Sequence, residues 1–176
     1  MNKKNLGKEF ENKIKSCLNK PELNFSLDRL PDPLGGFVGV RNISDFQGYK
    51  LPFQYYLECK CTYGNTLNFK SNITDDQWEG LTEKSKILGV LAGFCIWFID
   101  YEETVFVPIQ EMNRLRFIEN KKSLNIKDLN NINLFKIVGE KKRVYFDYDA
   151  DTFIKNLDRL CKEYWNIDFV QVKFNE

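Results

Sequence analysis

The ten residues FQYYLECKCT, positions 53–62, alternate between two kinds of side chain and predict the central strand of the fold. Every second residue from Phe53 is apolar or cysteine, whereas the other set includes Glu58 and Lys60. Side chains two apart in a strand share a face, roughly 6–7 Å from one another. A carboxylate and an ammonium group therefore project side by side from a strand whose other face is apolar.

A second carboxylate precedes this strand. Asp45 lies in ISDFQG, residues 43–48, and the turn-like sequence GYKLP follows at residues 48–52. If the two segments form a hairpin, Asp45 comes alongside Glu58. Two carboxylates can then share a divalent cation with Lys60 next to it, an arrangement suited to phosphodiester hydrolysis. The alternative is an ordinary surface ion pair between Glu58 and Lys60 on a half-exposed strand.

Length and composition limit the chemistry. The 176 residues predict one domain, 1–176, with a core over about 6–110 and a C-terminal hairpin and helix, about 120–176, packed on it. There is no histidine, which excludes Ser-His-Asp and Cys-His catalysis and histidine metal sites. The five cysteines have no C-x-x-C spacing and predict reduced core residues of a cytoplasmic protein.

The charge and hydropathy patterns exclude other classes. The longest apolar run, residues 87–99, is too short to span a bilayer, and no signal peptide is evident. Neither a Walker A nor a G-x-G-x-x-G sequence is present, so we expect no nucleotide cofactor. A net charge of +1 counts against nucleic-acid binding unless the positive charge is locally concentrated.

Two predicted helices bring further polar groups to consider. Residues 6–18 have helical periodicity, and Glu11 is either paired with Lys15 one turn later or a third acid directed at the metal site. Thr74 and Gln77 form a capping box for a helix running to about residue 87. Gln77 is explained by that role, and its amide can also orient an attacking water.

The other elements complete an α/β pattern. We expect strands at 24–30, 89–99 and 105–109, a proline- and glycine-rich loop at 29–36, and a polar connection at 63–72. Helices are expected at 110–119, 123–129 and 151–165, the last capped by Asp151. A hairpin pairs 135–138 with 144–148, and 170–174 is a final alternating segment.

Several of these stretches, taken in order, resemble the PD-(D/E)XK nucleases, and more narrowly the RecU family of Holliday junction resolvases, including phage-borne members. The resemblance covers about residues 6–157. The sequence departs from the family at Asp76, where a histidine is usual, and in a short loop of about 30–41 in place of the family's stalk. In addition, no proline precedes Asp45. The matching stretches are GKEFE 7–11, RLPDP 29–33, SDFQG 44–48, LECK 57–60, NFKSNI 68–73, DQ 76–77, 89–98 and 105–112.

The resemblance implies a restriction-endonuclease-like αβββαβ core with a mixed central sheet flanked by helices. It also implies a homodimer that uses Mg²⁺ or Mn²⁺ to cut branched DNA. In these roles Asp45 and Glu58 bind metal, with Glu11 at its edge, Lys60 assists the attacking water, and Gln77 orients water or substrate. The DNA-facing residues are expected to be Arg29, Arg41, Lys8 and Lys70.

Other functions remain open at the level of sequence. A restriction-type or nicking nuclease with a broader substrate range uses the same residues, and the short stalk-like loop leaves room for it. A DNA-binding module that retains the fold without cleavage belongs to a different class. Surface arginines with no ligand are the alternative for Arg29 and Arg41.

Overall fold

The computed structural model describes residues 6–30 and 42–166. Arg41, most of the predicted stalk-like loop and the final segment 170–174 lie outside the described residues. A six-stranded mixed sheet forms the centre, in the order β1-β2-β3-β5-β6-β8. Its strands are β1 (Ser26–Arg29), β2 (Phe46–Lys50), β3 (Phe53–Thr62), β5 (Val90–Phe98), β6 (Glu103–Pro108) and β8 (Phe135–Lys136).

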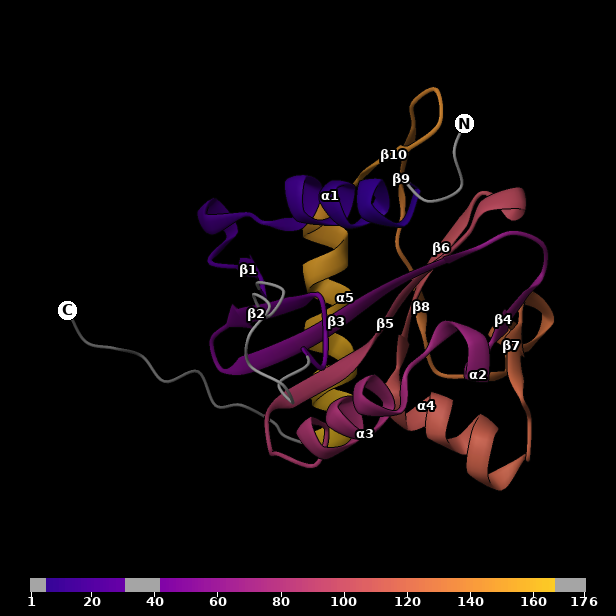
Figure 1. Cartoon of the computed structure of the whole chain (residues 1–176). Helices are drawn as coiled ribbons and strands as arrows, with labels where there is room; N and C mark the ends of the chain where they lie inside the picture. The colour runs from indigo at the N-terminus through magenta and orange to yellow at the C-terminus, as the bar shows by residue number, and fades with distance from the viewer. Residues whose placement is uncertain (1–5, 31–41, 167–176) are drawn as a thin grey trace, which may run out of the picture.

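Helices cover both faces of this sheet (Figure 1). On one face pack α1 (Leu6–Leu18) and α5 (Ala150–Trp165). On the other face pack α2 (Phe69–Asn72), α3 (Asp75–Lys84) and α4 (Ile109–Asn113). The predicted α/β architecture is therefore confirmed: from α1 to β5 the order is helix, three strands, helix α3 and strand, with β4 and α2 inserted between β3 and α3.

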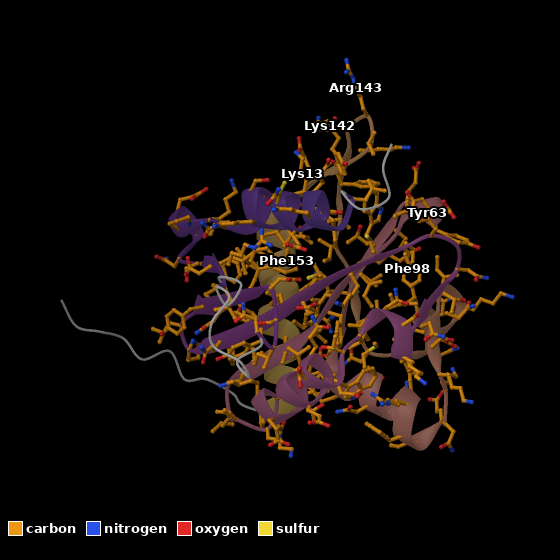
Figure 2. All side chains as sticks on the ribbon, viewed as in Figure 1. Lys13, Tyr63, Phe98, Lys142, Arg143 and Phe153 are labelled. Atoms are coloured by element: carbon orange, nitrogen blue, oxygen red, sulfur yellow. The ribbon has the colours of Figure 1, made fainter. Side chains whose placement is uncertain are left out.

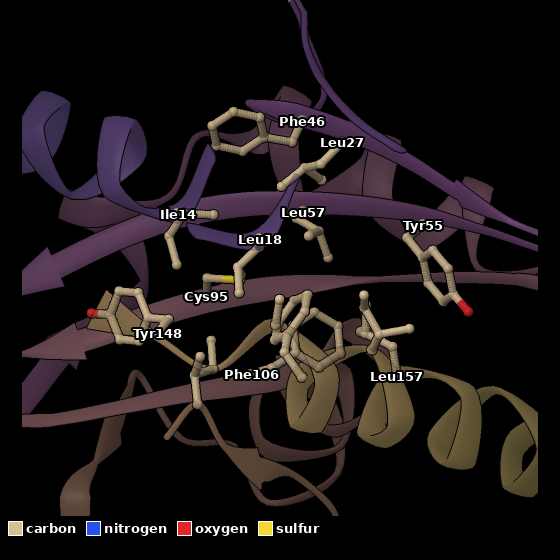
Figure 3. Close-up of a cluster of buried hydrophobic side chains, with 14 of the residues drawn as sticks. Ile14, Leu18, Leu27, Phe46, Tyr55, Leu57, Cys95, Phe106, Tyr148 and Leu157 are labelled. Carbon is tan, nitrogen blue, oxygen red and sulfur yellow. The ribbon is translucent and has the colours of Figure 1, made fainter. Parts of the chain in front are cut away.

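Strand β3 separates two apolar cores, as its alternation predicts. Tyr55 and Leu57 are buried in the core beneath α1 and α5, which Figure 3 shows together with Leu157. Tyr56 is buried in the core beneath α3. Glu58 is two residues further along β3, so it belongs to the α3 face, the face on which the polar residues of the strand collect.

Strand pairing fixes the neighbours of β3. It pairs antiparallel with β2 on one side and parallel with β5 on the other. All nine residues of β5 are buried, because both faces of this central strand are covered by helices. The chain crosses from β3 to β5 through α3, which brings the start of α3 close to the polar face of β3.

Some short helices and strands differ from the sequence predictions because they pair with segments that are distant in the sequence. The stretch expected to be a polar connection contains β4 (Thr66–Asn68) and α2, and β4 pairs with β7 (Ser123–Asn125). The predicted short helix at 123–129 is thus half strand, followed by the 3₁₀ helix η5 (Ile126–Asn131). Helix α3 ends at Lys84 rather than near Ile87, with Ser85 as its C-cap, and Gly89, with a φ of +80°, then turns the chain into β5.

The C-terminal region differs in two respects. Strand β8 joins β6 in the main sheet, and the hairpin is formed instead by β9 (Gly139–Lys141) and β10 (Phe146–Tyr148). Helix α5 is capped by Asp149 rather than Asp151, because the Asp149 carboxylate accepts the Thr152 N–H three residues later. The remaining short helices are η2 (Pro21–Leu23), η3 (Ile99–Tyr101) and the π-helical turn η4 (Arg114–Ile118).

Candidate active site

The β2–β3 hairpin brings Asp45 and Glu58 together. In its antiparallel register Phe46 faces Leu57, so the preceding residue, Asp45, lies beside Glu58. The backbone N–H of Cys59 donates to Asp45 Oδ2 at 2.8 Å and fixes the direction of that side chain. The two carboxyl groups are within hydrogen-bonding reach of each other. The hairpin expected from the sequence is thus present, with its acidic residues on the same side of the sheet.

Glu58 is buried, with only 3% of its side chain exposed. The ammonium group of Lys60 lies 2.8 Å from Glu58 Oε1 and is itself largely shielded from solvent. This burial excludes the alternative of an ordinary surface ion pair. A buried ion pair is costly to desolvate and is therefore weak evidence for a purely stabilising role.

Gln77 joins this ion pair from helix α3. Its Nε2 donates to Glu58 Oε1, while its Oε1 accepts from Lys60 Nζ at 3.1 Å. The same Oε1 accepts the Thr74 backbone N–H at 3.2 Å, which is half of the predicted capping box. The capping role of Gln77 is therefore confirmed, and its amide also reaches the polar face of β3, whereas its orienting of an attacking water stays a prediction.

The electrostatics of the acidic pair follow from this crowding. Burial, then the negative charge of Asp45, raises the pKa of Glu58 to about 7, although Lys60 acts in the opposite direction. Burial also raises the pKa of Asp45 above its ordinary value, opposed by the Cys59 N–H and by the charges of Lys60 and Arg29. Two carboxylates held this close repel one another unless a proton or a cation lies between them.

The donor set fits a hard divalent cation. Asp45 and Glu58 offer carboxylate oxygens, which Mg²⁺ and Mn²⁺ prefer, and a cation between them would relieve the mutual repulsion that helps to raise the pKa of Glu58. Within residues 6–30 and 42–166 no group of three or more acidic or thiol side chains is gathered closely enough to enclose an ion. Mg²⁺ is typically held by one or two carboxylates and completes its shell with water and phosphate oxygens.

Glu11 occupies the margin of the site. Its Oε2 accepts from Arg29 Nη2 at 2.6 Å, rather than from Lys15, which was the local alternative. The negative charge of Glu11 is close enough to contribute to the raised pKa of Glu58. Its role at the edge of a metal site stays a prediction. Arg29 is held by this ion pair at the end of β1, so its expected contact with DNA also stays a prediction.

The other basic residues are distributed over the surface. Lys8 on α1 and Lys70 on α2 are exposed, and Arg41 lies outside the described residues. Figure 2 shows that the β9–β10 hairpin carries Lys142 and Arg143 away from the body of the molecule. Positive side chains are therefore available near the ends of α1 and α2, despite a net charge of +1.

A close backbone approach sets the distance between α3 and the Asp45 segment. A Cβ atom at Gly80 would lie 2.2 Å from Cγ2 of Ile43, a distance that no side chain tolerates. Ile43 is two residues before Asp45, and Gly80 is one turn after Gln77 in α3. Glycine at position 80 therefore lets helix α3, which carries Gln77, pack close to the segment that carries Asp45.

Sequence reasoning missed two contributors to this geometry. The N–H of Cys59 orients Asp45, but a backbone donor leaves no signal in side-chain patterns. Gly80 was not singled out, although a lone glycine inside a helical pattern often marks close packing. Ser44, buried directly before Asp45, bonds the Phe46 carbonyl through its hydroxyl at 3.1 Å and stiffens the entry into β2.

The mixed central sheet with helices on both faces agrees with the α/β core expected from the sequence. Among solved structures, the chain is similar to that of Hjc, a Holliday junction resolvase from the archaeal hyperthermophile Archaeoglobus fulgidus, determined at 1.6 Å resolution. The two share 19% identity with a TM-score of 0.45, over 60% of this chain and 78% of the other. No protein-family model and no curated protein matches the chain. Within the described residues, no helix combines the length and hydrophobicity needed to cross a bilayer.

Proposed function

We propose that this protein is a metal-dependent endonuclease that hydrolyses phosphodiester bonds in branched DNA, with the four-way junction as its expected substrate. The observation that carries the proposal is the cluster in which Asp45, Lys60 and Gln77 meet the buried Glu58 on one face of β3. A structural ion pair would need neither a second carboxylate beside it nor an amide that bridges both charged groups.

Each side chain has a distinct task in this proposal. Asp45 and Glu58 hold the cation, and the Cys59 N–H keeps the Asp45 carboxylate turned toward it. Mg²⁺ or Mn²⁺ bound there would polarise the scissile phosphate and lower the pKa of the attacking water. Lys60 faces the same space and stabilises the negative charge that develops on the phosphate oxygens. Gln77 fixes the positions of the Lys60 and Glu58 side chains through one hydrogen bond to each.

The choice of branched DNA rests on the ordered motifs that resemble the RecU family. Cleavage of two strands of opposite polarity requires two active sites, which a twofold-symmetric dimer supplies. We therefore propose a homodimer in solution. Exposed lysines from both subunits, including Lys8, would add to the positive surface that contacts the DNA.

The test compares three synthetic substrates of matched length: a four-way junction, a fork and a linear duplex. Each is incubated with pure protein in Mg²⁺, in Mn²⁺ and in EDTA. We expect symmetric cuts in the junction with either metal and none in EDTA. Lys60→Ala protein, purified in the same way, controls for contaminating nucleases.

The outcomes separate the candidate functions. If the linear duplex were cut as fast as the junction, the protein would be a general or restriction-type nuclease rather than a junction resolvase. Tight binding without cutting of any substrate would favour a non-catalytic DNA-binding module. Cleavage of the same strength in EDTA would overturn metal dependence, and size-exclusion chromatography with light scattering tests the dimer.

A further inference from the structure

A groove of about 1030 Å³ opens beside the candidate active site. One wall is formed by α2 and the residues around it, including Asn68 and Lys70, and another by the π-helical turn η4 with Arg116 and Phe117. Asp76 at the start of α3 and Lys122 also line the groove. None of the predicted catalytic residues lines this groove, so it is a separate feature.

The groove and the catalytic cluster share the first turn of α3. Asp76 lines the groove, and the next residue, Gln77, contacts Glu58 and Lys60. Strand β4, which ends at Asn68 on the groove wall, follows β3 after a short turn. A strand of DNA that places a phosphate at Lys60 therefore has the groove directly within reach of its neighbouring nucleotides.

An exposed aromatic ring dominates one wall. The side chain of Phe117 is 62% exposed, although phenylalanine is normally buried. Its ring meets the buried Trp78 edge-on, with centroids 6.3 Å apart at 86°. The Arg116 guanidinium lies 4.5 Å from the Trp78 ring centroid and 5.2 Å from that of Phe117. These contacts hold the Phe117 ring in place, and the exposed part of the ring that Arg116 does not cover remains available to a ligand.

The charges around the ring favour a phosphate-bearing ligand. Lys70 and Lys122 are exposed, and neither forms a salt bridge among the residues that the structure describes. Lys121, by contrast, is engaged by Glu119 and Asp128. Asp75 and Asp76 at the start of α3 are the acidic members of the lining, and Asp75 lies 3.9 Å from the Arg116 guanidinium, so the charge of the groove is mostly positive.

These features select single-stranded over double-stranded DNA. In a duplex the base faces are stacked on one another and cannot reach Phe117, whereas an unpaired base offers its face to an aromatic ring. A mostly positive lining with one exposed aromatic ring suits one phosphate backbone with its bases turned toward Phe117. A second copy of this chain would have to bring its own acidic groups to Lys70 and Lys122.

We propose that this groove binds a single-stranded segment next to the scissile phosphate, with one base stacked on Phe117 and the flanking phosphates on Lys70 and Lys122. The proposal rests on the proposed nuclease function for the position of the scissile phosphate. It adds a substrate class, branched DNA that carries or opens an unpaired arm, such as a fork.

The test measures binding separately from cleavage. Glu58→Gln protein in EDTA is titrated with a fork that carries one single-stranded arm and with a blunt duplex, both fluorescently labelled. Phe117→Ala is expected to weaken fork binding about 5- to 100-fold and to leave duplex binding unchanged. Tyr101→Ala is the matched control, because Tyr101 is 50% exposed on η3, away from the groove.

Two further readouts separate stacking and charge from a merely structural effect. A 2-aminopurine in the single-stranded arm should be quenched on binding, lose that quenching with Phe117→Ala and regain it with Phe117→Trp. Lys70→Ala and Lys122→Ala should each reduce the salt dependence of fork binding by about one ion. Lys155→Ala on α5 is the control for a lysine on the opposite face.

The results distinguish failure of the groove from failure of the nuclease. Unchanged fork affinity and quenching in Phe117→Ala would overturn the groove proposal, even if the wild-type protein cuts junctions normally. Phe117-dependent quenching in a protein that cuts no DNA would keep the groove and overturn the nuclease. A change of oligomeric state in Phe117→Ala, measured by light scattering, would assign this surface to a second copy and overturn the single-strand proposal.

Discussion

The backbone N–H of Cys59 donates to the Asp45 carboxylate at 2.8 Å, so β3 orients the acid that lies beside its own Glu58. The hydrogen bond links two strands at the point where the polar groups collect. An acid held by a backbone donor loses little conformational freedom when it binds a ligand. The predictions below ask what each member of this cluster contributes.

Replacing Glu58 by glutamine keeps the shape of the side chain and removes its charge. We expect cleavage to fall at least about 100-fold, the scale of losing one transition-state contact, while the circular dichroism spectrum is unchanged. Lys60→Met, which keeps the apolar stem, should behave in the same way. Lys155→Met is the control and should cleave normally; wild-type rates in either site variant would contradict the assigned roles.

Metal binding should be visible as thermal stabilisation. A cation that binds only the folded protein at 100 times its Kd adds about 2.7 kcal/mol to the free energy of unfolding. We expect Mg²⁺ or Mn²⁺ to raise the Tm of the wild-type protein and to leave that of Asp45→Asn nearly unchanged. Equal shifts in both proteins would place the binding elsewhere.

The metal-free protein should lose stability as the pH rises. Because the folded state raises the pKa of Glu58 from 4.5 to about 7, it retains a proton that the unfolded chain releases. The free energy of unfolding therefore falls as the pH rises between these two pKa values, by about 3 kcal/mol, and levels off above them. Urea titrations in EDTA measure this slope, and Glu58→Gln should abolish most of it. A wild-type stability that rises over the same interval would contradict the sign.

Gln77 should affect activity beyond its contribution to helix stability. Gln77→Ala removes one half of a capping box and the amide that bridges Glu58 and Lys60. Asn125→Ala removes the cap of η5, which has a capping box of the same kind. Each substitution should cost about 0.5–2 kcal/mol of stability. Only Gln77→Ala should also slow cleavage, measured at a temperature well below the Tm of either variant. Equal cleavage rates in the two variants would show that Gln77 acts only as part of the helix cap.

Local chemistry explains what could be predicted from the sequence. The alternation over 53–62 placed Glu58 and Lys60 on one face, and the turn residues before it predicted the hairpin that delivers Asp45. The Thr74 cap follows from a motif spanning four residues. Each of these features depends on residues close in sequence, for which periodicity and capping rules are strongest.

Non-local pairing explains what could not be predicted. Glu11 has a basic neighbour one turn away, yet it bonds Arg29, which approaches only after β1 packs beside α1. Asp149 and Asp151 are equally suitable caps in composition, and the path of the chain before α5 decides between them. The groove at Phe117 arises from a π-helical turn that no apolar period signals.

The absence of a side chain at Gly80 sets the packing distance between helix α3 and Ile43. A methyl group there acts as a wedge, because it must displace either the helix or the segment leading to Asp45. Gly80→Ala should thus misalign the bridging amide and the acid while leaving every polar atom in place. A residue that carries out no chemistry would then govern turnover, and laboratory selection for activity should keep position 80 as glycine even though alanine is the better helix former.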